Sequence, residues 1–302
     1  MSFSRIFILG AGAIGSIYGA LLSEKTDVSL VGNKAHVKAI NAEGLTIAGD
    51  IRKIFFPTAI TEIKSIPEKA LILLTTKAYD MAEAIRRIRG LLKKDTVILV
   101  LQNGIGNEEI VRQLVAKKGT VLRGLTTMAA EFVKPGKIKF WSGETIIESH
   151  EDSRKIVNIF NLCGLKSRLS DDINKEVWNK LVANCVINPL TALFHVRNCE
   201  ILGESLRNVR HGIVEECVKV AEAEGIVLRQ HLAERIDKQI ANYANFSSMY
   251  QDLAKGNRTE IDFLNGKIVE LGKKHLIQTP LNETLVSFIK FMEREHGIPR
   301  EN

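Results

Sequence analysis

The chain has 302 residues, of which 45% are hydrophobic and 25% are charged. This composition excludes a disordered or fibrous protein, and the length is sufficient for two domains with separate cores. The formal net charge is +7, but basic residues are interspersed with acidic ones, as in Glu293-Arg294-Glu295, and form no basic stripe. We therefore expect no nucleic-acid partner, and the charge favours solubility and the attraction of small anions.

The sequence has no run of 18 apolar residues and no pattern of a signal peptide, so we expect a cytoplasmic protein with no membrane partner. The histidines form no ligand cluster, and the cysteines lack the paired spacing of a metal site. We expect reduced, structural cysteines and no metal. The four cysteines are Cys163, Cys185, Cys199 and Cys217.

The first predicted strand, residues 4–10, leads into Gly10-Ala11-Gly12-Ala13-Ile14-Gly15, and a helical pattern follows over residues 14–22. This is the arrangement of a dinucleotide-binding turn. Gly10 permits the sharp turn, Gly12 the approach of a pyrophosphate, and Gly15 close packing of helix on sheet. The helix N-terminus offers free N–H groups to phosphate. Glycine-rich turns also close ordinary strand–helix junctions, but the position directly after the first strand favours a nucleotide site.

The second predicted strand, residues 27–32, ends without the acidic residue that usually contacts the ribose in NAD sites. Asn33 and Lys34 stand there instead, and a lysine suits a 2′-phosphate. NADP(H) is therefore the favoured cofactor. The alternative is that the two residues only open the next helix, with Asn33 as its N-cap.

Short β-rich runs alternate with helical segments up to residue 171, which predicts a mostly parallel sheet covered by helices on both faces. Two hairpins are predicted within it, one formed by residues 44–48 and 51–56, the other by 137–141 and 144–148. Long helical periodicity follows. We predict an α/β fold with a Rossmann-type dinucleotide-binding domain over residues 1–171 and an all-helical substrate domain over 172–302. Further strands are predicted at 70–75, 96–101 and 120–124.

Lys77 and Asn103 follow the strands at 70–75 and 96–101. Open α/β sheets bind their ligands at the carboxyl ends of parallel strands. An ammonium there suits phosphate, and an amide suits cofactor or substrate. Taken singly, each residue is as well explained by an exposed lysine or a turn asparagine.

In the second domain, Lys180, Asn184 and Asn188 recur at every fourth position of an otherwise apolar helix. Buried amides are costly unless they are hydrogen-bonded, so this stripe needs a polar partner. A cleft for a polar substrate explains all three residues, although a structural network is the alternative. Pro189 is expected to kink or end the helix.

Asn245 and Ser248 precede a helix that breaks at Gly256-Asn257, and Glu260 follows. The local pattern is sufficiently explained by capping, with Ser248 as an N-cap and Asn257 with Glu260 as a pair resembling a capping box.

Together these residues closely resemble the ketopantoate reductase family (2-dehydropantoate 2-reductases), over nearly the whole chain. The matching segments are residues 10–15, Thr76-Lys77-Ala78, residues 102–106, Thr126-Thr127 with Ala129-Ala130, residues 180–192, residues 247–252 and residues 259–262.

The resemblance implies a Rossmann-type domain followed by a helical domain like that of 6-phosphogluconate dehydrogenase, with the active-site cleft between them. It implies Lys180 as proton donor and Glu260 as a second catalytic residue. It places Asn103 near both cofactor and substrate, and Lys77, Ala130 and Glu260 at the cofactor side or the closed site. Asn184, Asn188, Asn198, Asn245 and Ser248, with Lys180, are implied to hold the substrate. One position departs from the pattern, because many members carry arginine where this chain has Asn33.

The implied reaction is the NADPH-dependent reduction of 2-dehydropantoate, a small 2-oxo acid, to (R)-pantoate in pantothenate and coenzyme A biosynthesis. A related reductase of other 2-oxo acids, or one of the β-hydroxyacid type, is an alternative that the segment from Ser247 to Glu260 disfavours. A catalytically idle NADP-binding sensor is another, disfavoured by the intact Lys180, Asn184 and Glu260. A homodimer is compatible with the sequence.

Overall fold

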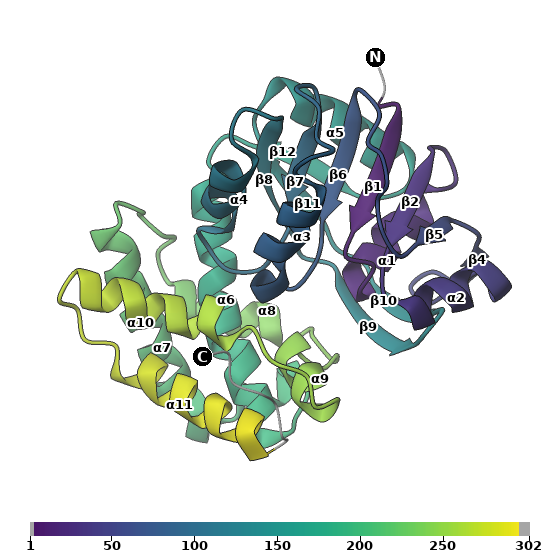
Figure 1. The fold of residues 1–302 in the computed structure, drawn as a ribbon. Coiled ribbons are helices and arrows are strands. Elements are labelled where there is room, and N and C mark those ends of the chain that lie inside the picture. Colours follow the sequence, from purple (N-terminus) through teal and green to yellow (C-terminus); the bar gives the residue numbers. More distant parts are fainter. Residues whose placement is uncertain (1–2, 296–302) are drawn as a thin grey trace. The chain divides into compact units, whose positions relative to one another are not determined.

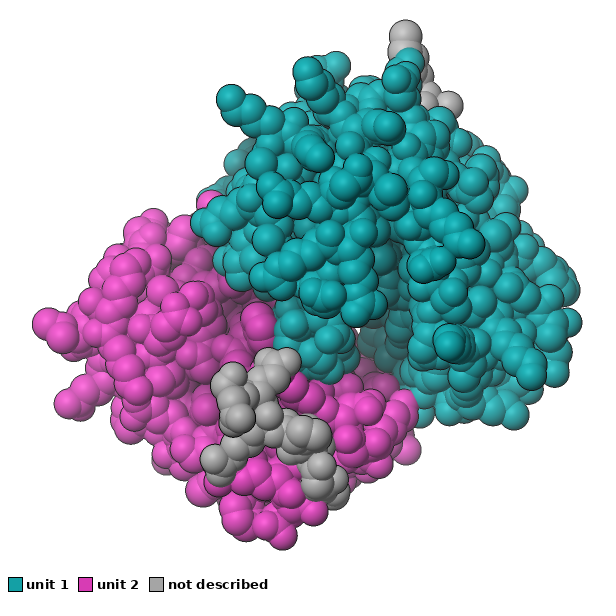
Figure 2. All heavy atoms as spheres, viewed as in Figure 1, with its two compact units in different colours: residues 1–102, 106–173 teal, residues 103–105, 174–302 magenta. Residues whose placement is uncertain are grey.

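A computed structural model describes residues 3–295, which form two compact units (Figures 1 and 2). Unit 1 contains the chain up to Gln102 and residues Gly106–Ile173. Unit 2 contains Asn103–Ile105 and the chain from Asn174 onward. Residues 1–2 and 296–302, which the two predicted domains include, lie outside the described part.

Unit 1 is built on an eight-stranded sheet in the order β12-β11-β8-β7-β6-β1-β2-β5. Strands β5, β2, β1, β6, β7 and β8 are parallel, whereas β11 is antiparallel to β8 and β12 is parallel to β11. The five strands predicted for the parallel sheet are confirmed. The bounds are β1 (Arg5–Leu9), β2 (Val28–Val31), β5 (Thr58–Ile60), β6 (Ala70–Leu74), β7 (Val97–Val100), β8 (Thr120–Thr126), β11 (Thr145–Glu148) and β12 (Ser167–Ser170).

Helices cover both faces of this sheet, and alternate residues of β1 therefore enter two different cores. Ile6 and Ile8 pack in the core that includes α1 and α5, whereas Phe7 and Leu9 pack in the core that includes α3 and α4. Burial on both faces explains why the central strands are continuous apolar runs. The helices of unit 1 are α1 (Ala13–Leu22), α2 (Lys34–Glu43), the 3₁₀ helix η1 (Ala78–Asp80), α3 (Met81–Ile88), α4 (Asn107–Val115) and α5 (Glu151–Leu162).

A second, four-stranded sheet has the order β4-β3-β10-β9. Helix α1 contacts β1 and β2 of the large sheet and β3, β9 and β10 of the small one. The predicted hairpin over 44–48 and 51–56 is confirmed as the antiparallel pair β3 and β4. The bounds are β3 (Leu45–Gly49), β4 (Lys53–Phe55), β9 (Ala129–Lys134) and β10 (Lys137–Trp141).

The predicted hairpin over 137–141 and 144–148 is wrong. Both strands exist, but β10 pairs with β3 and β9, and β11 pairs with β8 and β12. The link between them passes from one sheet to the other. The N–H of Ser142 donates to Oδ2 of Asp50 at 2.7 Å, and a Cβ on Gly143 would lie 2.4 Å from the Met128 nitrogen. Gly143 is thus explained by close backbone packing rather than by a hairpin turn.

Unit 2 is helical, and α6 is buried along most of its length, as its apolar sequence predicts. Its side chains share one core with residues of α7, α8, α9, α10 and α11. The helices are α6 (Ile173–Phe194), η2 (Asn198–Leu202), η3 (Glu204–Leu206), α7 (Arg207–Ala223), α8 (Leu232–Ile240), α9 (Ser248–Ala254), η4 (Ile261–Phe263), α10 (Asn265–Lys274) and α11 (Pro280–Glu295).

Helix α6 does not end at Pro189, contrary to one of the two predicted outcomes. Proline has no N–H, so the carbonyl of Cys185, four residues earlier, loses its helical partner. Nδ2 of Asn265 donates to that carbonyl at 2.9 Å. The side chain of Asn265 is fully buried and also donates to Oδ1 of Asn282. A remote asparagine therefore replaces the missing hydrogen bond and lets the helix continue.

Candidate functional site

The glycine turn of unit 1 is fixed by backbone contacts with the end of β6. Gly10 has φ +112°, and a Cβ there would lie 2.4 Å from the Thr76 nitrogen. A Cβ on Gly15 would lie 2.2 Å from the Gly10 carbonyl oxygen. The hydroxyl of Thr75 donates to that same carbonyl at 2.9 Å. Packing within the protein is sufficient to explain glycine at both positions.

Gly12 differs from these two glycines. It is exposed, its φ is −77°, and a Cβ built on it has no heavy atom within 4 Å. The packing of the protein therefore does not require glycine here, whereas close approach of a pyrophosphate does. Gly12 is also the N-cap of α1 and offers no side chain to the first-turn N–H groups, which include those of Ala13, Ile14 and Gly15. The turn thus fits a dinucleotide.

Asn33 has the N-cap role that was the alternative interpretation of the sequence. Its Oδ1 accepts from the N–H of His36 at 2.9 Å. Lys34, the first residue of α2, is exposed. The ring of His36 is buried, with Nε2 2.9 Å from the Ser16 hydroxyl and Nδ1 accepting from the N–H of Gly136. Burial lowers the pKa of His36. A neutral imidazole therefore ties α1 to the β9–β10 turn.

Two further predicted cofactor residues lie on different elements of unit 1. Lys77 is half-buried directly after β6, as the N-cap of η1. Ala130 is half-buried on β9, opposite Phe140 of β10. Nε2 of Gln102 donates to the Thr76 hydroxyl at 3.3 Å and so links the segments that follow β6 and β7.

Three predicted site residues of unit 2 meet in one hydrogen-bonded cluster. Nζ of Lys180 donates to Oδ1 of Asn103 at 2.8 Å. Nδ2 of Asn103 donates to Oε2 of Glu260 at 3.2 Å. Lys180 and Asn103 are half-buried, and Glu260 is 6% exposed. The chain separation between these residues, 77 and 157 positions, shows that the cluster is a product of the tertiary fold.

The charges of its neighbours determine how the Asn103 amide is oriented. An ammonium only donates and a carboxylate only accepts, so the amide must turn its oxygen to Lys180 and its nitrogen to Glu260. The amide thereby links a cation and an anion without itself carrying charge. Such a cluster can hold a protonated amine beside a substrate oxygen and supply a proton.

The predicted substrate residues on α6 become more buried along the helix, with Asn184 half-buried and Asn188 6% exposed. Asn198 is 5% exposed, and its Oδ1 has no hydrogen-bond partner within residues 3–295. Because a buried acceptor without a partner is costly, this oxygen is suited to a ligand donor. The Asn198 N–H donates to the carbonyl of Asn245 at 3.0 Å, so these two predicted residues lie together.

The predicted capping roles in this region need correction. The N-cap of α9 is Ser247, whose hydroxyl accepts from the N–H of Tyr250, and Ser248 is the exposed first residue of the helix. No helix begins at Asn257. Glu260 precedes η4 but caps it with no side-chain hydrogen bond. The carboxylate of Glu260 is buried and accepts a hydrogen bond from Asn103, a partner that the capping interpretation does not include.

Sequence patterns gave no indication of Glu293, which contacts the residue next to Glu260. One of its carboxylate oxygens accepts from both the N–H and the hydroxyl of Thr259, each at 2.7 Å. The 34-residue separation and the ordinary helical context of Glu293 explain why no local signal could reveal it.

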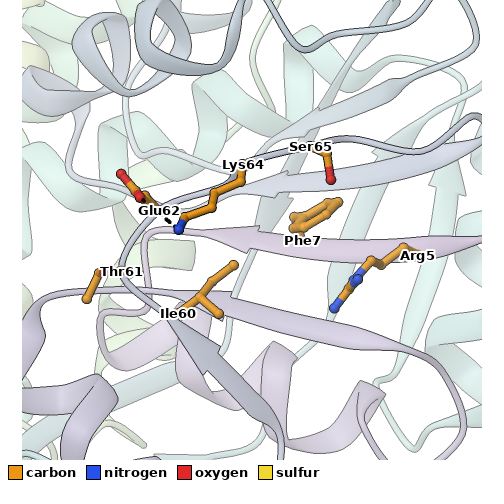
Figure 3. Close-up of a pocket in the computed structure, with 7 residues that line it drawn as sticks. All are labelled: Arg5, Phe7, Ile60, Thr61, Glu62, Lys64 and Ser65. Carbon is orange, nitrogen blue, oxygen red and sulfur yellow. Dashed lines mark ion pairs between the residues drawn. The ribbon is translucent and has the colours of Figure 1, made fainter.

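A hollow of about 410 Å³ lies on unit 1 beside β1 and contains none of the predicted site residues (Figure 3). Glu62 and Lys64 pair at its rim, with 3.8 Å between Oε1 and Nζ. Its lining residues are Arg5, Phe7, Ile60, Thr61, Glu62, Lys64 and Ser65.

Within residues 3–295, no helix is long and apolar enough to span a membrane, and no group of three or more His, Cys, Asp and Glu side chains could hold a metal. The four cysteines are free, and all but the half-buried Cys199 are buried.

A doubly wound sheet with a glycine turn, followed by a helical unit with a lysine–asparagine–glutamate cluster, defines a dinucleotide-binding protein of the α/β class. The model of the family "Ketopantoate reductase PanE/ApbA" matches residues 6–152, and that of its C-terminal domain matches residues 172–293. The chain is 36% identical to the 2-dehydropantoate 2-reductase of Pyrococcus horikoshii over 97% of its own length and 99% of that protein. It belongs to the ketopantoate reductase family.

Solved structures agree with this assignment. The ketopantoate reductase of the family PanE/ApbA from Ralstonia eutropha JMP134 has a TM-score of 0.91 at 31% identity, with 97% of this chain and 99% of that one covered. A D-mandelate dehydrogenase in complex with NADH and anilino(oxo)acetate also gives a TM-score of 0.91, at 29% identity and with the same coverage.

Proposed function

We propose that the protein reduces 2-dehydropantoate to (R)-pantoate with NADPH, a step of pantothenate and coenzyme A biosynthesis. The observation that carries this proposal is the cluster of Lys180, Asn103 and Glu260, together with family membership over both parts of the chain. The enzyme is an oxidoreductase that acts on a CH–OH group. Its substrate is a small 2-oxo acid.

Lys180 is the proposed proton donor. NADPH, when bound, supplies a hydride to the ketone carbon, and negative charge then develops on the ketone oxygen. An ammonium held by the Asn103 oxygen stabilises that charge and donates a proton to it. Glu260 accepts from the amide nitrogen of Asn103 and so keeps the Asn103 oxygen turned toward the lysine.

The remaining residues divide into cofactor and substrate contacts. We propose that Asn184, Asn188, Asn198, Asn245 and Ser248, with Lys180, orient the 2-oxo acid. Polar groups without charge do this without competing with the ammonium. The proposed cofactor contacts are Gly10, Ala11, Gly12, Ala13, Ile14, Gly15, Asn33, Lys34, Lys77, Asn103, Ala130 and Glu260. We also propose that residues 1–171 form the cofactor domain and 172–302 the substrate domain.

The cofactor preference rests on the end of β2, where no carboxylate stands and Lys34 is exposed. A structural neighbour holds NADH, so the two nicotinamide cofactors need direct comparison. We further propose a cytoplasmic location, which suits the four free cysteines, and a homodimer, to be tested by light scattering.

The test measures the reduction of a panel of 2-oxo acids by the purified protein, monitored by nicotinamide absorbance. We expect the highest kcat/KM with 2-dehydropantoate and NADPH. Phenylglyoxylate, the 2-oxo acid that corresponds to mandelate, is the informative competitor. A higher kcat/KM with phenylglyoxylate would replace the proposed substrate, and no turnover of any 2-oxo acid would favour the idle sensor.

A further inference from the structure

The loop before η4 is held by a carboxylate from α11. Oε1 of Glu293 accepts from the Thr259 N–H and from the Thr259 hydroxyl, both at 2.7 Å. Glu293 is 6% exposed and Thr259 is 1% exposed, so both bonds are shielded from water. Residues 257–259 are neither helix nor strand, so no regular ladder supplies a partner for this N–H.

Two further hydrogen bonds fix the backbone on both sides of Glu260. The N–H of Ile261 donates to the Thr259 hydroxyl at 3.2 Å, and the N–H of Phe263 donates to the Glu260 carbonyl at 3.0 Å. The Thr259 hydroxyl therefore bonds to Glu293 on one side and to the Ile261 N–H on the other, so Glu260 lies between two residues that this hydroxyl connects. The main chain that carries the Glu260 carboxylate is tied to α11 by this connection.

A nearby lysine balances the charge of the buried carboxylate. Nζ of Lys290, one helical turn before Glu293, lies 3.8 Å from Oε2 of Glu293 and also pairs with Asp262. The second oxygen of Glu293 thus faces a cation while the first holds Thr259. Arg258 also pairs with Asp262, so the segment from 258 to 262 is held by charged contacts around the Glu293 anchor.

We propose that Glu293 is a positioning residue for Glu260, and through it for Asn103 and Lys180. These hydrogen bonds form a continuous series from Glu293 to Thr259, along the chain to Glu260, and by side chains to Asn103 and Lys180. A displacement of about 1 Å at a reacting group can cost about 10²-fold in rate, so an anchor of this kind matters for turnover. This inference rests on the proposed function.

The first test is amide hydrogen exchange, which requires no substrate. Glu293→Ala removes both acceptor bonds, and we expect faster exchange over residues 258–263 while the rest of α11 keeps its protection. Glu293→Gln keeps an oxygen acceptor for Thr259 and is expected to exchange like the wild type in this segment. Leu285→Ala, at a buried position of the same helix, is the matched control for general destabilisation. Equal exchange over 258–263 in Glu293→Ala and Leu285→Ala would overturn the proposal.

The second test is kinetic, at a temperature where every variant is folded. Glu293→Ala should lower kcat/KM for 2-dehydropantoate about tenfold or more, with Glu293→Gln within about threefold of wild type and Leu285→Ala unchanged.

In a Glu260→Gln background the effect of Glu293→Ala should fall below about threefold, because the two changes act on one group. Full additivity would overturn the positioning role. A wild-type protein that does not reduce 2-dehydropantoate would refute the proposed function instead, and the exchange test would still decide whether Glu293 anchors the loop.

Discussion

The glycine turn after β1 and the side chains around Lys180 are held in different ways. Backbone contacts fix the turn, because Gly10 and Gly15 pack against main-chain atoms where no Cβ fits. Side chains fix the Lys180 cluster, because Asn103 and Glu260 reach it from distant parts of the chain, while Glu293 holds Thr259, the residue next to Glu260. The turn is thus inseparable from the fold of unit 1, whereas the cluster consists of groups that substitutions can remove singly.

This contrast predicts different consequences of mutation. Changes at the packed glycines should act mainly on stability, and changes in the cluster mainly on turnover. Changes at the exposed edge of the cofactor site, such as at Lys34, should affect only the selectivity between NADPH and NADH.

Gly10→Ala has the largest effect expected on stability. The positive φ and the close Thr76 backbone make an added Cβ both strained and overpacked, so we expect a loss of about 3 kcal/mol in the free energy of unfolding. Gly12→Ala is the matched control, with a loss below about 1 kcal/mol but weaker NADPH binding. Chemical denaturation and cofactor titration measure the two quantities. Equal destabilisation by both substitutions would contradict the assignment of Gly12 to the ligand.

Glu260→Gln should affect turnover more than stability. Glutamine can still accept from Asn103 but carries no charge, and hydrogen bonds to charged groups contribute about 1.5–3 kcal/mol, which corresponds to about 10–100-fold in kcat/KM. Steady-state kinetics and thermal denaturation should be compared on the same preparation. Wild-type kcat/KM in this variant would exclude a need for the negative charge.

Lys34→Ala tests the exposed margin of the cofactor site. An exposed ion pair contributes at most about 1 kcal/mol, so NADPH binding should weaken about fivefold or less, with NADH binding unchanged. Titrations of both cofactors measure this difference. An equal loss for NADH and NADPH would assign Lys34 a general electrostatic or structural role.

The smallest expected effect concerns His36. Burial lowers its pKa in the folded protein, so the folded state binds the proton less readily than the unfolded state, whose histidine has a pKa of about 6.5. The stability that the folded protein gains from a neutral His36 is therefore fully present above this pH and is lost as the pH falls below it. The free energy of unfolding, measured by denaturation, should be lower at pH 5.5 than at pH 7.5. This difference should be smaller in His36→Gln than in the wild type. The same pH dependence in both proteins would exclude His36 as its source.

Local sequence signals predicted the parts of the structure that depend on neighbouring residues. The glycine turn, the parallel strands and the hairpin of β3 and β4 were all recognisable from patterns within a few positions. The stripe of Lys180, Asn184 and Asn188 was recognisable because a helix places every fourth residue on one face.

Features that depend on remote partners were not predictable in this way. The strands β10 and β11 resemble a hairpin, but competition from β3, β8, β9 and β12 decides their pairing. Pro189 lies inside a continuous helix, where Asn265, 80 residues away from Cys185, donates the replacing hydrogen bond. Glu260 resembles a capping residue until its contact with Asn103 is known. The sequence indicates which residues are unusual, whereas the tertiary fold decides their partners.

Lys180 is proposed to donate the proton, and the glycine turn to bind the cofactor. The most direct test measures both NADPH affinity and kcat for 2-dehydropantoate in Lys180→Ala. We predict a kcat lower by about 10²–10⁴-fold, the range for a positioned proton donor, with the Kd for NADPH within about threefold of wild type. Near-normal turnover in a folded Lys180→Ala protein that still binds NADPH would exclude Lys180 as the proton donor.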